Sequence, residues 1–263
     1  MSGESHVSLR EVVRLYDGPP AVQALGPINL EIRRGEFLSI VGPSGCGKST
    51  LLDVVSGLAR PTSGSVRFEG RELCGEVPEG IGVVFQEDSS MPWLSVRDNV
   101  AFSLRTSGLP KQEAGDRVDH AVSFMGLAQF VDHYPAQLSG GMRQRVCIAR
   151  TLVLHPRLIL LDEPFGALDQ QTRLLMGDEL LRLWRETGAT VLLITHALDE
   201  AAMLSDRVGV MSARPGRFID LVETEWPRDR DSRVISDPKF GALTGRLWSS
   251  LREESLKAMG RAA

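Results

Sequence analysis

GPSGCGKST, residues 42–50, fits the pattern G-x-x-x-x-G-K-[ST], in which a glycine-rich loop wraps the phosphates of a nucleotide. The stretch follows the apolar run FLSIV at residues 37–41 and precedes the helical pattern LLDVVSGL. Glycines at positions 42, 45 and 47 permit positive φ and close backbone approach, so successive N–H groups and the positive end of the next helix can face phosphate oxygens. The alternative is an ordinary strand, turn and helix. The preceding apolar run and the following helical pattern favour a nucleoside triphosphate site.

The side chains of this loop are expected to have separate tasks. Lys48 would reach the β and γ phosphates, and the Ser49 hydroxyl would hold Mg²⁺. Cys46 lies beside a lysine and a helix amino terminus, which could make its thiol reactive; the alternative is a small residue that simply fits the loop. The complete predicted loop is Gly42, Pro43, Ser44, Gly45, Cys46, Gly47, Lys48, Ser49 and Thr50.

Composition narrows the class of protein. The 263 residues carry a net charge of −4, so no general electrostatic attraction to nucleic acid is expected. No run approaches the eighteen or so apolar residues that span a bilayer, and the amino terminus MSGESHVSLR lacks an apolar signal core. Three cysteines form an odd number without metal-ligand spacing. We therefore expect a globular cytoplasmic protein that reaches a membrane only through another protein.

The order of hydrophobic patterns predicts an α/β fold. Alternation at 7–15 and 28–32 indicates antiparallel strands packed over a nucleotide-binding core. From residue 37 the pattern becomes strand, helix, strand, with FLSIV, a helix at 50–58, SVRFEG, and IGVVFQ ending at Gln86. Residues from about 95 to 155 show apolar spacing near 3.6 and predict an inserted group of helices.

The second half of the chain returns to strands. LILL, TVLLIT and VGVM are continuous apolar runs separated by helical patterns at 170–186 and 197–204. Such runs are typical of a mainly parallel sheet covered on both faces. After Arg214, the stretches RPGR and WPRDRDSR are interpreted as a solvated connection, or alternatively as a contact for anionic lipid or a membrane subunit. A final amphipathic helix is expected at about 238–257 and should pack on the core.

A second chemical signal is RLILLDEPFGALD, residues 157–169. Its buried strand delivers Asp162 and Glu163 to the carboxyl end of the sheet, where ligands bind in open α/β folds. Asp162 would bind Mg²⁺, directly or through water. Glu163 would orient and polarise the attacking water, because it lies close to the γ-phosphate without being the primary metal ligand.

A third signal, LSGGMRQR at residues 138–145, places Ser139, Gly140 and Gly141 at the start of another helix. This is a second anion-binding helix amino terminus in one chain. Either the two sites converge within the monomer, or the serine and glycines of one copy complete the site of another copy. Spacing alone leaves both readings open.

In the order of these motifs the chain resembles the ATP-binding-cassette (ABC) family, from about residue 9 to residue 211. The resemblance implies a P-loop ATPase core with a mainly parallel sheet, an N-terminal antiparallel β-subdomain and an inserted α-helical subdomain. Residues 1–225 would form the ATPase domain, with the helical subdomain at about 88–156, and residues 226–263 a short helical extension. It also implies a head-to-tail homodimer with ATP and Mg²⁺ at the interface, each nucleotide held by one copy's phosphate loop and the other copy's Ser139–Gly140–Gly141 signature.

Four further residues gain roles only from the resemblance. Gln86 of FQED would touch Mg²⁺ and the attacking water, and His196 of ITH would contact the γ-phosphate. Asp169 of GALD would communicate across the dimer. Tyr16 would stack on adenine, although the stretch DGPPAVQ that follows it is longer than in many members of the family. Alone, His196 could cap a helix, Gln86 could be a polar residue at a strand end, and Tyr16 could be a packing aromatic. The resemblance makes Glu163, His196, Lys48 and Gln86 the catalytic set.

One apolar stretch points to a particular branch of the family. Met91, Pro92, Trp93 and Leu94 are either internal packing or an exposed ridge for a partner helix. The resemblance favours contact with integral-membrane permease subunits, as in the peripheral ATPase of bacterial importers for nitrate, sulfonate or taurine, bound at the cytoplasmic face of the inner membrane. A solute-binding protein would then be an indirect partner, and nucleic acid would not be one. The alternatives are the ATPase of an ABC exporter and a soluble ABC ATPase unconnected with transport.

Overall fold

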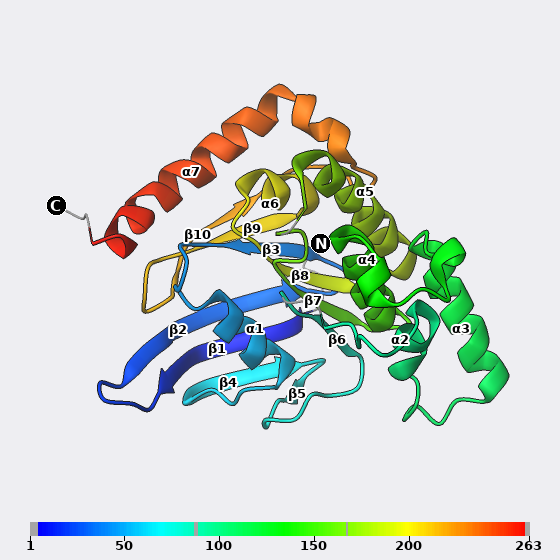
Figure 1. The fold of residues 1–263 in the computed structure, drawn as a ribbon. Helices are drawn as coiled ribbons and strands as arrows, with labels where there is room; N and C mark the ends of the chain where they lie inside the picture. Colours follow the sequence, from blue (N-terminus) through cyan, green and yellow to red (C-terminus); the bar gives the residue numbers. More distant parts are fainter. Residues whose placement is uncertain (1–4, 87–88, 167, 261–263) are drawn as a thin grey trace.

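The computed structural model describes residues 5–86, 89–166 and 168–260, which form two sheets and their covering helices (Figure 1). The strands are β1 (Ser5–Tyr16), β2 (Val22–Arg33), β3 (Phe37–Val41), β4 (Ser63–Phe68), β5 (Arg71–Glu72), β6 (Ile81–Val84), β7 (Leu158–Asp162), β8 (Thr190–Ile194), β9 (Arg207–Met211) and β10 (Phe218–Glu223). The helices are α1 (Lys48–Ser56), α2 (Val96–Phe102), α3 (Lys111–Phe124), α4 (Gly140–Leu152), α5 (Gln170–Thr187), α6 (Leu198–Leu204) and α7 (Pro238–Ala258). The α/β class is therefore confirmed.

The larger sheet has the strand order β10-β9-β3-β8-β7-β6. Strands β6, β7, β8, β3 and β9 run parallel, and β10 is antiparallel to β9. Every residue of β3, β7, β8 and β9 is buried, as expected for continuous apolar runs in a sheet covered on both faces. Because parallel strands end at one edge, the segments that follow β3, β6, β7, β8 and β9 meet there.

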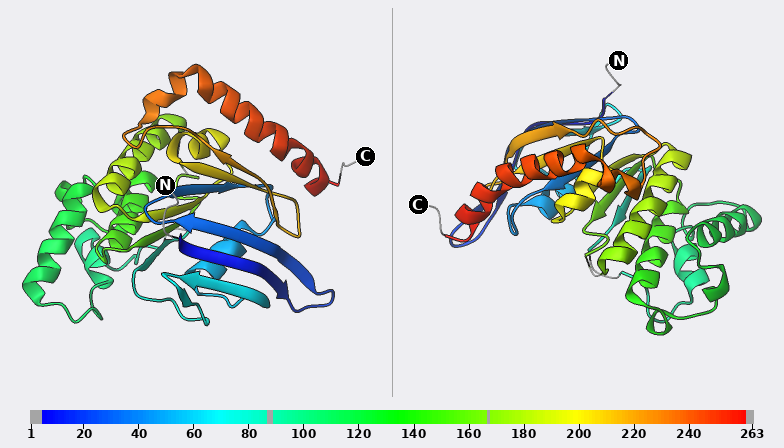
Figure 2. Two further views of the ribbon diagram at one scale, coloured as in Figure 1. Left: turned by 180° about the vertical axis from the view of Figure 1, so that it is seen from behind. Right: turned by 90° about the horizontal axis from the view of Figure 1, so that it is seen from above.

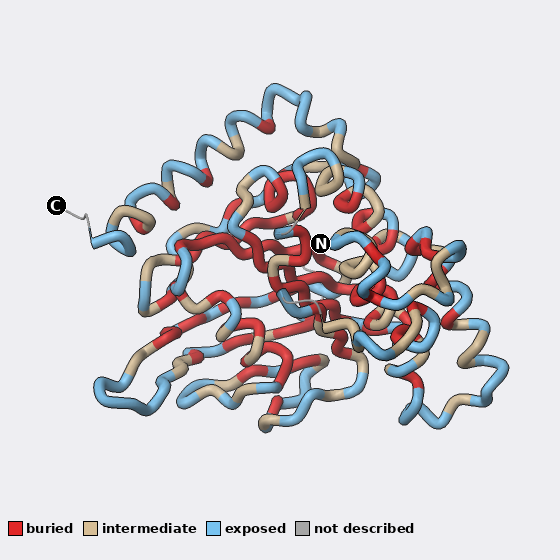
Figure 3. Tube along the Cα trace, in the orientation of Figure 1, coloured by how far each residue is buried: buried red, intermediate tan, exposed pale blue. Residues whose placement is uncertain are grey.

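Alternate residues of β3 pack into two separate hydrophobic cores on the two faces of the larger sheet. Leu38 and Ile40 pack toward α1 and the four-stranded antiparallel sheet, whose order is β2-β1-β4-β5. Phe37 and Val41 pack on the opposite face, in a core that also holds residues of α4, α5 and α6. Figure 2 shows the antiparallel sheet and these helices on opposite sides of the larger sheet, and Figure 3 shows the buried strands between them.

The helical insertion and the final helix follow the expectations from periodicity. Helices α2, α3 and α4 lie between β6 and β7, while Asp88, the predicted start of this subdomain, lies outside the described residues. Helix α7 packs on the core through Phe240, Leu247 and Leu251. No helix in the described ranges is long and apolar enough to cross a membrane.

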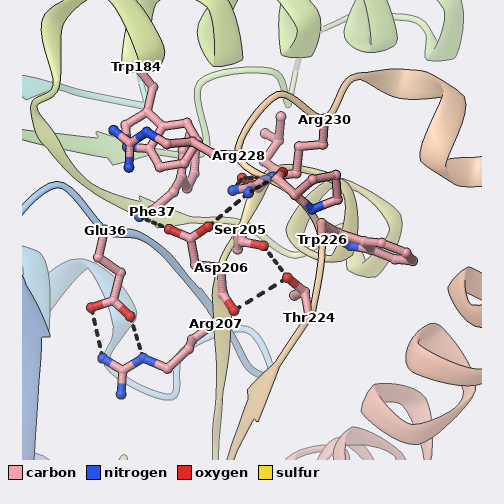
Figure 4. Close-up of polar contacts among 12 residues, drawn as sticks. Glu36, Phe37, Trp184, Ser205, Asp206, Arg207, Thr224, Trp226, Arg228 and Arg230 are labelled. Carbon is pink, nitrogen blue, oxygen red and sulfur yellow. Dashed lines mark hydrogen bonds and ion pairs between the residues drawn. The ribbon is translucent and has the colours of Figure 1, made fainter. Parts of the chain in front are cut away.

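A polar network secures the connection between the larger sheet and α7 (Figure 4). Asp206 accepts hydrogen bonds from the Phe37 backbone N–H at 2.9 Å and from Arg230 Nη1 at 2.8 Å. Arg228 and Arg230 also lie over the ring of the buried Trp184, at 4.2 and 4.7 Å from its centroid. The segment that precedes α7 is therefore bound to the core by aromatic and ionic contacts.

Two details of the predicted strand pattern are corrected. SVRFEG does not continue the parallel core, because β4 pairs antiparallel with β1. The connection after Arg214 contains β10, which pairs with β9 and was not predicted. Only Val222 of β10 is fully buried, so this edge strand lacks the continuous apolar signal of the central strands.

Candidate functional site

A cavity of about 640 Å³ opens at the carboxyl edge of the larger sheet. Its volume lies in the range of small-molecule and cofactor sites. It is lined by Tyr16, Val22, Ala24, Ser44, Gly45, Gly47, Lys48, Ser49, Thr50, Gln86, Glu163, His196 and Arg214. Residues that follow the five parallel strands therefore meet residues of β1 and β2 at one concave site.

The phosphate loop has the conformation that its glycines predict. Gly45 and Gly47 have φ values of 74° and 109°, and a Cβ on Gly47 would lie 2.7 Å from the Ala24 carbonyl oxygen. Lys48 is buried at the start of α1, where its Nζ donates to the Gly42 oxygen at 2.8 Å and the Pro43 oxygen at 3.1 Å. Within the described ranges, no carboxylate forms an ion pair with Lys48. The ammonium group is thus available to a phosphate.

Cys46 has a packing role rather than a reactive one. Its side chain is buried, and burial raises the pKa of its thiol despite the opposing charge of Lys48. A Cβ on Gly42 would lie 2.8 Å from its Sγ, so the thiol packs closely behind the loop. Gly42, Pro43 and Cys46 do not line the cavity; the other six predicted loop residues do. The structure therefore supports the interpretation of Cys46 as a small residue that fits the loop and contradicts its interpretation as a reactive thiol.

The far end of the cavity is formed by Tyr16 with Val22 and Ala24. The Tyr16 side chain is 40% exposed, and its hydroxyl oxygen lies 3.4 Å from Thr50 Oγ1. The Arg14 guanidinium carbon is 4.7 Å from the centroid of the tyrosine ring, a cation–π contact that supports its orientation. The longer hairpin after Tyr16 therefore does not remove this aromatic from the site. A planar base could stack here.

Asp162 has the surroundings of a cation ligand. Its carboxyl is buried, and Oδ1 has no hydrogen-bond partner in the described structure. Burial raises its pKa, while a hydrogen bond from the Ser49 hydroxyl acts in the opposite direction. A free carboxylate oxygen beside a hydroxyl fits the oxygen preference of Mg²⁺, whose charge would offset the cost of burial. These two residues fit the predicted metal site.

Glu163 is the point where three predicted residues converge. Its Oε2 accepts a hydrogen bond from Gln86 Nε2 at 3.1 Å and lies 3.1 Å from His196 Nδ1. The three residues follow β6, β7 and β8, which end together at the cavity. Glu163 has a φ of 45°, a left-handed conformation that costs a residue other than glycine about 1–2 kcal/mol. The Glu163 side chain lines the cavity, and its charge adds to the raised pKa of the neighbouring Asp162 carboxyl.

The serine and glycine signature occupies a different place. Ser139 is the N-cap of α4 and accepts a hydrogen bond from the Met142 N–H at 3.3 Å. Asp169 is the N-cap of α5, where Thr172 donates through its N–H at 3.0 Å and its hydroxyl at 2.6 Å and lowers the carboxyl pKa. None of Ser139, Gly140, Gly141 and Asp169 lines the cavity. The two predicted anion sites do not converge within one chain.

Arg214 is a cavity residue that sequence reasoning missed. It follows β9, and its Nε and Nη2 both donate to the Gly45 carbonyl oxygen, at 3.1 and 2.9 Å. Arg214 is exposed to solvent, as the interpretation of RPGR as a solvated connection expects, but it also lines the cavity, which that interpretation did not include. The available signal was the position of a cation directly after an apolar strand, at the edge where the other site residues were expected.

A buried carboxyl behind the site gives a testable pH dependence. Glu200 of α6 is 6% exposed; its Oε2 accepts a hydrogen bond from Thr195 Oγ1 at 3.1 Å, and its Oε1 has no partner in the described structure. Burial raises the pKa of Glu200 to about 7, with Thr195 and Arg173 opposing this shift and Glu163 adding to it. The folded protein therefore keeps a proton here that the unfolded chain releases near pH 4.5.

We expect the free energy of unfolding to fall as pH rises from the unfolded toward the folded pKa of Glu200, by about 3 kcal/mol in total. The stabilisation is complete below the unfolded pKa and is lost as pH approaches the folded pKa of about 7. Glu200→Gln cannot titrate and should lack this contribution. Urea unfolding of both proteins at several values between about pH 5 and about pH 8 measures the difference. Parallel stability curves would contradict the buried-carboxyl assignment.

Comparisons with known proteins find similar chains over most of this sequence. The profile of the ABC transporter family matches residues 25–166. The chain is 48% identical to the taurine import ATP-binding protein of Roseobacter denitrificans, over 91% of this chain and 90% of that protein. It is 41% identical to the nitrate import ATP-binding protein of a Synechocystis strain, over 94% and 95% of the two chains.

Two solved structures are similar in fold. One is a dimeric ATP-binding cassette in a post-hydrolysis state with bound ADP and Pi; its TM-score is 0.74 at 32% identity, covering 84% of this chain and all of that one. The other is part of an ABC transporter complex from Clostridium perfringens, with a TM-score of 0.76 at 30% identity, covering 90% and 93%.

Proposed function

The chain belongs to the ABC transporter family, and from this membership we propose that it is the ATP-hydrolysing subunit of an importer for a small anionic solute. As an ABC cassette it is an ATPase coupled to transport. The observation that carries the proposal is the convergence of Gln86, Glu163 and His196 beside the phosphate loop.

The residues of the cavity suggest how hydrolysis is promoted. The phosphate-loop N–H groups and Lys48 would bind the phosphate chain, and Tyr16 would stack on adenine. Ser49, Asp162 and Gln86 would hold Mg²⁺, which when bound neutralises charge that develops on the phosphates. Glu163 would accept a proton from the attacking water. Gln86 and His196 both contact its carboxylate; Gln86 would also touch the attacking water, and His196 would contact the γ-phosphate.

The complete site would need a second copy of the chain. The cavity lacks the signature residues Ser139, Gly140 and Gly141, and a similar cassette forms a dimer with bound ADP and Pi. In a head-to-tail dimer, the start of α4 from one copy would face the phosphates in the other copy's cavity, because a helix amino terminus attracts anions. Asp169, at the start of α5, would lie near the same interface.

The predicted ridge at Met91, Pro92, Trp93 and Leu94 supports a membrane partner. Trp93 is 71% exposed, whereas Asn99 of α2 is completely buried. Asn99 Nδ2 donates to the Met91 and Leu94 carbonyl oxygens at 3.1 and 2.9 Å, and its Oδ1 accepts from the Met91 N–H at 2.7 Å. A buried amide thus fixes the backbone that presents the tryptophan. An exposed tryptophan on a backbone fixed in this way is typical of an interface anchor, here for a permease helix.

The finer assignments come from relatives. Taurine and nitrate import proteins are similar over nine-tenths of this chain or more, so a small anion is the proposed cargo and a solute-binding protein an indirect partner. The chain would act at the cytoplasmic face of the inner membrane. We retain residues 1–225 as the ATPase domain, 88–156 as its helical subdomain and 226–263 as an extension.

Affinity purification from native membranes in mild detergent, followed by identification of the co-purifying proteins, tests this proposal. We expect a polytopic permease and a solute-binding protein. A permease with no solute-binding protein would favour an exporter. Recovery of soluble proteins alone would overturn the transport role and leave the ATPase site unaffected.

A further inference from the structure

The loop at residues 212–217, between β9 and β10, is built against the nucleotide cavity. Its Gly216 N–H donates to the Ala24 oxygen at 2.9 Å, and its carbonyl accepts from the Gly26 N–H at 2.9 Å. A Cβ on Gly216 would lie 2.3 Å from the Cys46 carbonyl oxygen, so only glycine permits this approach. The loop is therefore attached to β2 and packed on the back of the phosphate loop.

Arg214 projects from this loop to the cavity. A guanidinium has five N–H donors, and two donor nitrogens of Arg214 bind the Gly45 carbonyl oxygen. The group therefore has further N–H donors for a ligand. Within the described ranges, no carboxylate lies at ion-pair distance from Arg214. Lys48 is the other strong cation that lines the cavity. A second cation without an acidic partner, held to a phosphate loop, is suited to a phosphate oxygen.

The final helix holds the residue next to Arg214. Glu254 of α7 is 8% exposed, and its Oε2 accepts a hydrogen bond from the Ala213 backbone N–H at 2.7 Å. Lys257, one turn later, donates to the other carboxyl oxygen. Leu247 and Leu251 are buried on the same helix and fix its position on the core. One hydrogen bond thus connects α7 to the backbone that carries the guanidinium.

We propose that Arg214 contacts the phosphate chain of the bound nucleotide and that helix α7, through Glu254 and Ala213, holds Arg214 in place. Arg214 is then a second phosphate-binding cation beside Lys48, and Glu254 is a positioning residue. The carboxyl-terminal helix contributes to nucleotide affinity although it does not line the cavity. This inference rests on the proposed assignment of the cavity as the nucleotide site.

Calorimetric titration with MgADP tests the contact without hydrolysis. Arg214→Ala should raise the Kd about tenfold, the usual effect of losing one charge-assisted hydrogen bond, and Arg214→Lys should give an intermediate value. Arg217→Ala is the matched control, because Arg217 lies in the same loop and donates to the Gly26 carbonyl at 2.8 Å but does not line the cavity. Its Kd should stay within about twofold of the wild type. In steady-state ATPase assays Arg214→Ala should raise KM more than it lowers kcat.

A second set of variants tests the role of α7. Glu254→Ala should raise the Kd for MgADP about threefold, whereas Glu254→Gln keeps an acceptor for Ala213 and should restore wild-type affinity. In the Arg214→Ala background, Glu254→Ala should have no further effect, because the two residues act through one contact. A lower melting temperature with an unchanged Kd in Glu254→Ala would overturn the role of α7.

Lys48→Ala separates the inference from the function on which it rests. If Lys48→Ala abolishes MgADP binding while Arg214→Ala leaves it unchanged, the Arg214 contact is wrong and the nucleotide site stands. If neither variant changes the affinity, the cavity is not the nucleotide site and both proposals fail.

Discussion

Replacing Glu163 with Gln should lower kcat for ATP hydrolysis by at least about 100-fold while leaving MgATP binding close to that of the wild type. The amide has nearly the volume of the carboxylate and can still accept a hydrogen bond from Gln86, but it cannot accept a proton from water at neutral pH. In the proposed site, binding would depend on the phosphate loop and Lys48, which this change does not touch. ATP-bound dimers should therefore accumulate, because the step that separates them is blocked.

Two measurements on the same sample check this prediction. Phosphate release gives kcat, and size-exclusion chromatography with MgATP gives the monomer and dimer fractions. Glu179→Gln is the matched control, since Glu179 is an exposed carboxylate of α5 that pairs with Arg182 and does not line the cavity. Its kcat should equal that of the wild type. Undiminished hydrolysis by Glu163→Gln would remove Glu163 from the catalytic role, and lost ATP binding would indicate a structural one.

The fold could be predicted largely because its central elements are strongly patterned. Strands with every residue buried leave continuous apolar runs such as LILLD at β7, and the glycine loop after β3 identifies where the parallel strands end. Edge elements leave weaker signals. Strand β10 alternates exposed and half-buried residues around one buried valine, so it was interpreted as a polar connection.

In the site, residues that belong to a local sequence motif could be predicted, whereas a residue that depends on a tertiary contact could not. Lys48, Asp162 and Glu163 could be placed because each lies directly beside a strand end or helix start within one motif. Arg214 could not be assigned, because its partner Gly45 is far away in the sequence and a lone arginine in a polar stretch resembles a solvated one. The structure was also needed to choose between the two interpretations of Cys46. Burial raises the pKa of its thiol and the charge of Lys48 lowers it, and the extent of burial could not be read from the sequence.

Replacing Trp93 with Glu should separate the ATPase from its membrane partner without affecting the nucleotide site. The indole is exposed on a backbone fixed by Asn99, so the substitution should not disturb the fold. A buried interface tryptophan typically contributes at least about 2 kcal/mol, and a charge in its place adds a desolvation cost. Association with the permease should weaken at least about thirtyfold.

Solute uptake in proteoliposomes, together with co-purification of the permease, measures this coupling, while MgADP affinity reports on the nucleotide site. Uptake should be lost and the affinity retained. Trp248→Glu is the matched control, because Trp248 is half exposed on α7, outside the ridge at Met91, Pro92, Trp93 and Leu94. Trp93→Phe keeps an aromatic anchor and should preserve part of the uptake. If Trp93→Glu still drives uptake at the wild-type rate, the permease docks elsewhere, and the rigid presentation of this tryptophan by Asn99 serves another partner.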